Sequence, residues 1–139
     1  MFNLVKVVRV EPGAELDGTV YDQWLHIEYG DCKASVFDHM LIAPEHVSGE
    51  MHEVKIIIMA TSIEPSVSSN VGVAGNRFTG KVVAIRESKG YYDHLIDIQG
   101  LKVHLIENKL YDIGGYISVK GRMDLDDMQY PSPNAWEPM

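Results

Sequence analysis

The chain has 139 residues, of which 45% are apolar and 23% are charged, and its formal net charge is −8 at pH 7. This composition excludes an intrinsically disordered protein and predicts one ordinary domain or two very small ones. No apolar run approaches the roughly 20 residues that a membrane helix needs. A single cysteine, Cys32, excludes an internal disulfide, and the sequence MFNLVKVVRV is unlike a secretory signal, so we expect a cytoplasmic protein.

Charge is distributed unevenly along the chain. Residues 1–76 contain 4 Lys and Arg against 11 Asp and Glu, residues 77–122 contain 8 against 5, and residues 123–139 contain none against 4. The acidic total argues against a general polyanion binder, because phosphate contacts supply most non-specific affinity for nucleic acids. The middle segment is nevertheless locally positive between two acidic segments.

The first half of the chain is rich in strand-forming patterns. β-Branched or alternating runs end at turn residues such as Gly30-Asp31, and Pro44-Glu45 is suited to start one helical turn. The run HEVKIIIMAT is apolar on both faces after Lys55, which predicts a central strand. The strands expected here are Phe2–Val10, Thr19–Tyr29, Cys32–Phe37 and His52–Thr61.

The second half shows the same pattern after a Ser/Gly/Asn-rich interval. We expect strands at Phe78–Ile85, Tyr91–Ile98, Leu101–Ile106 and Tyr116–Arg122, with glycines at the breaks between them. The beginning of the acidic, proline-containing C-terminal segment could extend the last strand. The predicted organisation is a first β module over 1–61, a linker or mobile loop over 62–77, a second β module over 78–128 and a flexible tail over 129–139.

The two halves resemble each other. HIEYGDCKASVF (His26–Phe37) aligns with LIDIQGLKVHLI (Leu95–Ile106), and GEMHEVK (Gly49–Lys55) aligns with GGYISVK (Gly114–Lys120). The second pair shares G-x-x-x-x-V-K, but the distance between the two blocks differs between the halves. Duplication and chance similarity between alternating strands both remain open.

The second half resembles an OB-fold, a small antiparallel barrel. The features that carry this resemblance are Gly80 near the start of a long first strand, a hairpin turning at Gly100, an irregular connection over Glu107–Gly115 and a closing strand that ends at Val119–Arg122. The resemblance covers about residues 78–128, with a weaker echo over 18–61, and no separate fifth strand is evident. It implies an all-β protein of OB-like barrel elements, as one barrel or as two pseudo-repeats.

The C-terminal segment DLDDMQYPSPNAWEPM is similar to the acidic tails of OB-type single-strand-binding proteins, which end near an aromatic residue. By that resemblance Asp126, Asp127 and Trp136 would contact a protein partner. The tail would then compete for the binding face or recruit partners.

The segment GNRFTGK (Gly75–Lys81) contains the G-x-x-x-x-G-K core of a P-loop. A P-loop also needs a Ser or Thr next and a helix N-terminus to hold phosphate. Val82 follows instead, and VVAI is a strand former. The segment is therefore predicted to be a turn that enters a strand.

The six histidines and the single cysteine do not form a recognisable catalytic or metal-binding pattern. No H-x-H or H-x-x-x-H spacing occurs, and only one cysteine could join the histidines as a ligand. Asp38 and His39 lie near Cys32 in sequence, but neighbouring strand residues point to opposite faces, so Asp38 is not placed to orient His39. We expect no catalytic residue, no metal and no cofactor.

Lysines, an arginine, a histidine and tyrosines alternate with apolar residues on the strands of the second module. Aromatic and cationic side chains on a barrel face are what single-stranded nucleic acid requires, because bases stack on the rings and cations follow the backbone. An ordinary solvated sheet face would have the same composition. The residues predicted to bind nucleic acid are Tyr91, Tyr92, Lys102, His104, Tyr116, Lys120 and Arg122.

The sequence thus predicts a non-enzymatic protein that binds single-stranded nucleic acid on its second module. The alternative is a protein-interaction or assembly subunit that docks through its acidic first half or tail and forms oligomers. A small-molecule site inside a barrel has no residue pattern that supports it. No membrane partner is expected.

Overall fold

The computed structural model describes residues 1–129 and is almost entirely β, which confirms the all-β, barrel-like fold class. Short 3-10 turns at η1 (Glu45–Val47) and η2 (Ser68–Asn70) are the only helical elements within this range, and no helix in it is long and apolar enough to cross a membrane. The strands are β1 (Asn3–Pro12), β2 (Glu15–Leu16), β3 (Thr19–Val20), β4 (Gln23–Tyr29), β5 (Cys32–Asp38), β6 (Met51–Ser66), β7 (Gly72–Ala74), β8 (Arg77–Ser88), β9 (Tyr91–Ile98), β10 (Leu101–Glu107) and β11 (Tyr116–Gln129).

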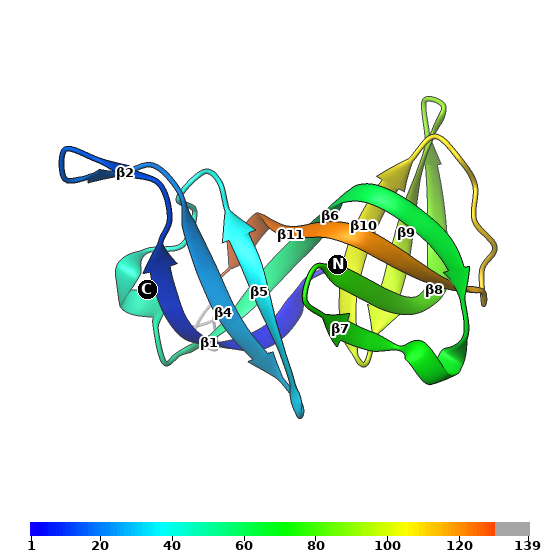
Figure 1. Cartoon of the computed structure of the whole chain (residues 1–139), viewed down its shortest axis with the longest axis horizontal. Coiled ribbons are helices and arrows are strands. Elements are labelled where there is room, and N and C mark those ends of the chain that lie inside the picture. Colours follow the sequence, from blue (N-terminus) through cyan, green and yellow to red (C-terminus); the bar gives the residue numbers. More distant parts are fainter. Residues whose placement is uncertain (130–139) are drawn as a thin grey trace, which may run out of the picture.

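The strands of the first half close into one barrel, on the left of Figure 1. β1 pairs with β4, β4 with β5, and β5 makes a parallel contact with β11. β11 pairs with β6, and β6 returns to β1 and completes the ring. The small β2–β3 hairpin projects away from this barrel.

The strands of the second half close into another barrel, on the right of Figure 1. β8, β9 and β10 form an antiparallel meander, β10 contacts β6 in parallel, and β11 pairs with both β6 and β8. Gly80 is needed at the crossing of β8 and β9, because a Cβ atom there would lie only 2.5 Å from the backbone oxygen of Asp97. Close approach of two strands at a glycine is a common device for closing a small barrel.

β6 and β11 are long strands that belong to both barrels. Their antiparallel pairing runs from Tyr116↔Ser66 to Gln129↔Glu53, and Figure 1 shows the two strands crossing from one barrel into the other. The end of β6 therefore completes the second barrel, and the end of β11 completes the first. The fifth strand that the second module lacks in sequence is supplied by the first module.

Alternation of buried and exposed side chains explains most of these strands. In β4 every second residue is buried, and the inward residues of both barrels form one hydrophobic core. The predicted central strand at His52–Thr61 is confirmed, because it lies within β6, which pairs with β11 on one side and with β1 and β10 on the other. Ile56 and Ile58 are buried, but Met59 on the other face is 51% exposed, because β6 leaves the first barrel at this point.

The segment predicted as a linker or mobile loop, 62–77, contains regular structure. Ser62–Ser66 is the end of β6, η2 and β7 follow, and Arg77 begins β8. Pro65 is tolerated within β6 because this part of the strand pairs with β11 on one side, opposite Ile117. The Ser/Gly/Asn composition therefore gave the wrong local structure here, since sheet pairing overrides it.

The internal resemblance of the two halves has a counterpart in the pairing register. Asn3 lies opposite Val54 and Phe78 lies opposite Val119, while Lys6 is opposite Met51 and Lys81 is opposite Tyr116. These pairs coincide with the shared G-x-x-x-x-V-K segments. The last strand runs beyond the predicted Arg122 to Gln129, so the predicted tail starts within β11, and residues 130–139 lie outside the described part of the chain.

Candidate functional site

Two related clefts lie where the barrels meet. One, here called the open cleft, lies between β4 and β5 of the first barrel and the β7–β8 turn and β11, and it has a volume of about 650 Å³. The corresponding place between β10 and the start of β1 is here called the filled cleft, because Met1 and Asn3 bond to β10 there. The polar side chains of the open cleft are those of His26, Glu28, Lys33, Ser35, Asn76 and Arg122.

The β4–β5 hairpin positions one wall of the open cleft. Its turn contains Gly30 with a positive φ of 55°, and the resulting register places His26 opposite Ser35 and Glu28 opposite Lys33. His26 Nδ1 lies 2.9 Å from Ser35 Oγ. Lys33 Nζ is 3.9 Å from Glu28 Oε1, and the Lys33 side chain is 82% exposed.

An irregularity in β1 brings a carboxylate to the same wall. The register of β1 against β4 shifts between Val7 and Arg9, which places Arg9 opposite His26. Glu11 then lies 3.6 Å from Arg9 and 3.5 Å from His26 Nε2. Despite this proximity, His26 Nε2 is buried and has no hydrogen-bond partner within the described residues.

The floor of the open cleft is a bulge of β11 held by the β7–β8 turn. Gly121 donates its backbone N–H to Asn76 O at 2.8 Å, and the β11 register shifts between Lys120 and Gly121. A Cβ atom on Gly121 would overlap the backbone oxygen of Met59. Glycine is therefore required for the two barrels to approach at this point.

Arg122 is held firmly beside this floor. Its guanidinium donates two hydrogen bonds to Asp124, at 2.5 and 2.9 Å, and lies 4.3 Å from the centre of the Phe37 ring. The hydrogen bond to Asp124 raises the pKa of Arg122 above its ordinary value. The positive charge at this wall is therefore permanent and fixed in position.

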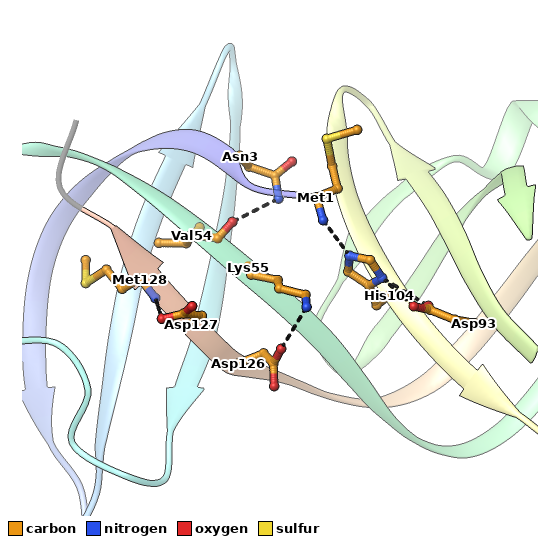
Figure 2. Close-up of polar contacts among 9 residues, drawn as sticks. All are labelled: Met1, Asn3, Val54, Lys55, Asp93, His104, Asp126, Asp127 and Met128. Atoms are coloured by element: carbon orange, nitrogen blue, oxygen red, sulfur yellow. Dashed lines mark hydrogen bonds and ion pairs between the residues drawn. The ribbon is translucent and has the colours of Figure 1, made fainter. Parts of the chain in front are cut away.

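The first residues of the chain occupy the filled cleft, and Figure 2 shows the contact of Met1 with His104. Asn3 accepts a hydrogen bond from Lys102 N and donates one to Lys102 O, both at 2.7 Å, and is itself buried. The Met1 nitrogen lies 3.1 Å from His104 Nε2, and His104 Nδ1 lies 3.0 Å from Asp93. The Asn3 side chain thus makes the same pair of bonds to β10 as a neighbouring strand would.

The structure does not bring the seven residues predicted to bind nucleic acid together. Tyr91 is 57% exposed at the β8–β9 turn, Tyr92 follows on β9, and Tyr116 lies half-buried on β11. Lys102 and His104 line the filled cleft, whereas Arg122 lines the open cleft. Lys120 is exposed beside a neighbouring hollow of about 550 Å³ that shares Asn76, Gly121 and Arg122 with the open cleft.

Carboxylates neutralise most of the cations in this predicted face. Lys102 pairs with Asp97 at 3.1 Å, His104 contacts Asp93, and Arg122 is bound to Asp124. Cations that are already paired within the protein offer little attraction to a phosphate backbone. The local excess of positive charge in the sequence therefore does not form a continuous positive track.

Two of the three residues predicted to contact a protein partner lie on β11. Asp126 pairs with Lys55 at 3.3 Å (Figure 2), and Asp127 accepts a hydrogen bond from the backbone N–H of Met128. Trp136 lies outside the described residues. Both aspartates are thus engaged within the fold.

The segment that resembles a P-loop is a turn followed by a strand. Ala74 and Arg77 pair across it in the β7–β8 hairpin, and β8 continues to Ser88. Within residues 1–129 no group of three His, Cys, Asp or Glu side chains is placed to hold a metal ion.

Comparison with solved structures gives one informative similarity. The chain resembles a crystal structure of the cytoplasmic molybdate-binding protein ModG with molybdate bound, with a TM-score of 0.53 and 15% sequence identity, over 94% of this chain and 96% of the other. At this identity the similarity establishes the fold over nearly the whole of both chains. No protein-family model and no curated protein matches the sequence.

The prediction of single-stranded nucleic-acid binding is wrong. The similar structure is that of a protein that binds a small anion, and the cations of the predicted face are paired and divided between separate surfaces. The prediction of a single-stranded nucleic-acid partner is therefore also wrong. The physical reason is that sequence shows how many cations a segment carries but not which carboxylates lie beside them.

Sequence reasoning missed the first-module side of the open cleft. A signal was present, because a two-residue turn at Gly30-Asp31 fixes the register that places His26 opposite Ser35. The internal alignment also placed Lys33 opposite Lys102, which lines the corresponding cleft. The contribution of Asn76 and Gly121 could not be found this way, since it depends on how the two barrels meet.

Proposed function

We propose that this protein binds a small tetrahedral oxyanion, with molybdate as the first candidate, in the open cleft and without catalysing a reaction. The similarity of the whole fold to a cytoplasmic molybdate-binding protein is the observation that carries this proposal. It also favours a cytoplasmic location. At 15% identity it does not assign residues, so the site is argued from the cleft itself.

The chemistry of the open cleft suits a small anion. Its lining includes a hydroxyl (Ser35), an imidazole (His26), an asparagine (Asn76), an ammonium and a guanidinium group, with the Glu28 carboxylate beside Lys33. These are donors that recognise oxyanions. A volume of about 650 Å³ accepts a tetrahedral oxyanion with part of its hydration shell.

The two cations have different roles in this proposal. Arg122 is paired with Asp124, which offsets its charge, and it presents its remaining N–H donors from a fixed position on the wall. Lys33 is only loosely paired with Glu28, at 3.9 Å and largely in solvent. Because an exposed ion pair of this kind contributes little, the ammonium can turn from Glu28 to a bound anion at small cost.

Isothermal titration calorimetry with molybdate tests the proposal, with sulfate, phosphate and chloride as competing anions. We expect saturable 1:1 binding that Ser35→Ala and Lys33→Ala each weaken by about tenfold, the size of one charge-assisted hydrogen bond. Lys109→Ala is the matched control, because Lys109 lies on the far β10–β11 loop and contacts Tyr111. Absence of binding at about 1 mM molybdate, or equal weakening by the control, would contradict the proposal.

A further inference from the structure

We propose that anion binding in the open cleft is coupled to the uptake of one proton by His26, because protonated His26 turns the Ser35 hydroxyl into a donor for the anion. This inference rests on the proposed function and names the chemistry by which the same site responds to pH. The two groups that carry it are His26 and Ser35, which face each other across the β4–β5 hairpin.

The two ring nitrogens of His26 have different surroundings. Nδ1 lies 2.9 Å from Ser35 Oγ, whereas Nε2 is buried, lacks a hydrogen-bond partner within the described residues and lies 3.5 Å from Glu11 Oε1. A neutral imidazole carries one proton, so it donates at one of these two nitrogens and can only accept at the other.

Consider first the neutral ring with its proton on Nε2. The proton then faces the Glu11 carboxylate, and Nδ1 must accept the hydroxyl proton of Ser35. In that arrangement Ser35 has no proton left to donate and presents only lone pairs to an incoming anion. The site is then poorly suited to bind an oxyanion.

The neutral ring with its proton on Nδ1 has the opposite fault. Ser35 then accepts from His26 and its hydroxyl proton is free, but the bare lone pair of Nε2 faces the Glu11 carboxylate in a buried position. Two acceptors that face each other without a proton repel one another. This tautomer is therefore disfavoured.

The protonated ring removes both faults. Nδ1–H donates to Ser35 Oγ, Nε2–H faces Glu11, and the Ser35 hydroxyl is free to donate to the anion. The added positive charge on the ring also attracts the anion directly. An oxyanion should therefore bind His26 in its protonated form more tightly, and by linkage its binding draws a proton onto the ring.

Charged groups on every neighbouring element surround this pair. From β1 Glu11 faces the ring and is shared with Arg9, which lies opposite His26. Glu28 on β4 and Lys33 on β5 form the loose pair beside it, and Arg122 on β11 lines the same cleft. Glu11 has the opposite charge to a protonated ring, whereas Lys33 and Arg122 have the same charge as it.

Another histidine of the chain shows the contrasting case. His94 is fully buried, its Nδ1 donates to Leu105 O at 3.1 Å, and its Nε2 accepts the backbone N–H of Tyr111 at 3.0 Å. A neutral ring satisfies both contacts, so His94 is suited to a purely structural role. Neutral His26 satisfies both of its contacts only by accepting the hydroxyl proton of Ser35, which an anion in the cleft would need.

The test is calorimetric titration of molybdate at about pH 7 in two buffers of different ionisation enthalpy, repeated between about pH 6.5 and 8, a range in which histidine side chains change charge and molybdate stays a dianion. For the wild-type protein we expect uptake of up to one proton per anion and an affinity that rises as the pH falls, approaching tenfold per pH unit at the upper end. His26→Gln should bind without proton uptake and with an affinity independent of pH. His39→Gln, at an exposed position beyond β5, should behave as the wild type.

Three outcomes decide between the possibilities. Molybdate binding to the wild type without proton uptake overturns the coupling and leaves the proposed function standing. Unchanged proton uptake in His26→Gln assigns the proton to another group and also overturns it. Absence of any binding to the wild-type protein overturns the coupling and the proposed function together.

Discussion

The open and filled clefts occupy corresponding places at the junction of the two barrels, yet only one of them is free. In the filled cleft Asn3 bonds both backbone groups of Lys102, and Met1 contacts His104 (Figure 2). In the open cleft the residue that corresponds to Asn3 is Phe78, which lies opposite Val119 as Asn3 lies opposite Val54. A phenyl ring has no donor or acceptor with which to bond the edge of β5, so the space beside Lys33 stays open.

This difference shows how a nearly symmetric fold leaves one junction open and fills the corresponding one. The strand order and the hairpins of the two barrels correspond, and so do the Lys33–Glu28 and Lys102–Asp97 ion pairs. One amide in place of one phenyl ring then decides whether a cleft is sealed or accessible. Four substitutions test or refine this comparison.

The largest loss of stability is expected when the hydrogen bonds of Asn3 in the filled cleft are removed. Asn3→Ala removes both hydrogen bonds to Lys102 and leaves those backbone groups without a partner, so we expect a loss of about 3 kcal/mol in the free energy of unfolding. Urea denaturation measures this. Asn70→Ala, at an exposed asparagine of η2, should cost less than about 0.5 kcal/mol. Similar losses in both variants would mean that Asn3 does not seal the cleft.

The second effect concerns the floor of the open cleft. Gly121→Ala places a methyl group against the backbone of Met59, so the β11 bulge must shift, at a cost of about 2 kcal/mol. Gly115→Ala is the comparison, because its Cβ would lie 3.2 Å from a backbone oxygen, whereas the Cβ at Gly121 would overlap one, and it therefore requires a smaller shift. Thermal unfolding should separate the two variants, and molybdate affinity should fall only in Gly121→Ala. If the two variants proved equally stable, the close approach at Gly121 would have to be abandoned.

A smaller effect is expected from the wall of the open cleft. Arg122→Gln loses the paired hydrogen bonds to Asp124 and the stacking on Phe37, which together contribute about 1 kcal/mol at this partly exposed position. Arg122→Lys keeps the charge but not the planar fork, so it should recover little of the stability. Denaturation of both variants beside Arg86→Gln, at an exposed arginine of β8, measures this. Full recovery in the lysine variant would show that charge alone matters there.

The smallest effect at neutral pH is expected at Tyr29, whose counterpart in the second barrel is Ile98. Burial, together with nearby Cys32 and Asp97, raises the pKa of Tyr29 to about 12, and its hydroxyl has no hydrogen-bond partner within the described residues. A raised pKa in the folded state favours folding below the unfolded value of about 10, and this contribution is lost as the pH rises towards 12.

Tyr29→Phe should therefore change stability by less than about 0.5 kcal/mol at pH 7, because the phenol has no partner to lose. Above about pH 10 the variant should lose stability less steeply than the wild type does. Urea denaturation across this range measures both, with Tyr91→Phe at an exposed tyrosine as the control. A large loss at pH 7 would reveal a contact of the hydroxyl beyond those described.

Sequence reasoning located most of the strands because their signals are local. Alternation predicted β5, β9 and β10 to within one residue and the end of β4, although the predicted Thr19–Tyr29 also includes β3, and glycines marked the turns between them. It failed at Ser62–Ser66, where a Ser- and Pro-containing segment is a strand, because β11 alone supplies its pairing. For the site, the cations and tyrosines of the second module predict a binding face, but their pattern does not show that Asp97 and Asp124 pair with Lys102 and Arg122.

The sequence by itself determined the all-β class, the turn positions and the similarity of the two halves, since these depend on side-chain alternation and on glycines along short stretches. The tertiary structure alone decided that each half completes the barrel of the other, because a shared strand is visible only in pairings between residues as distant as Glu53 and Gln129. It also decided which cleft stays open. In sequence, Asn3 and Phe78 are simply a polar and an apolar residue. Whether each closes its cleft depends on the strand edge it meets across the junction, which is β10 for Asn3 and β5 for Phe78.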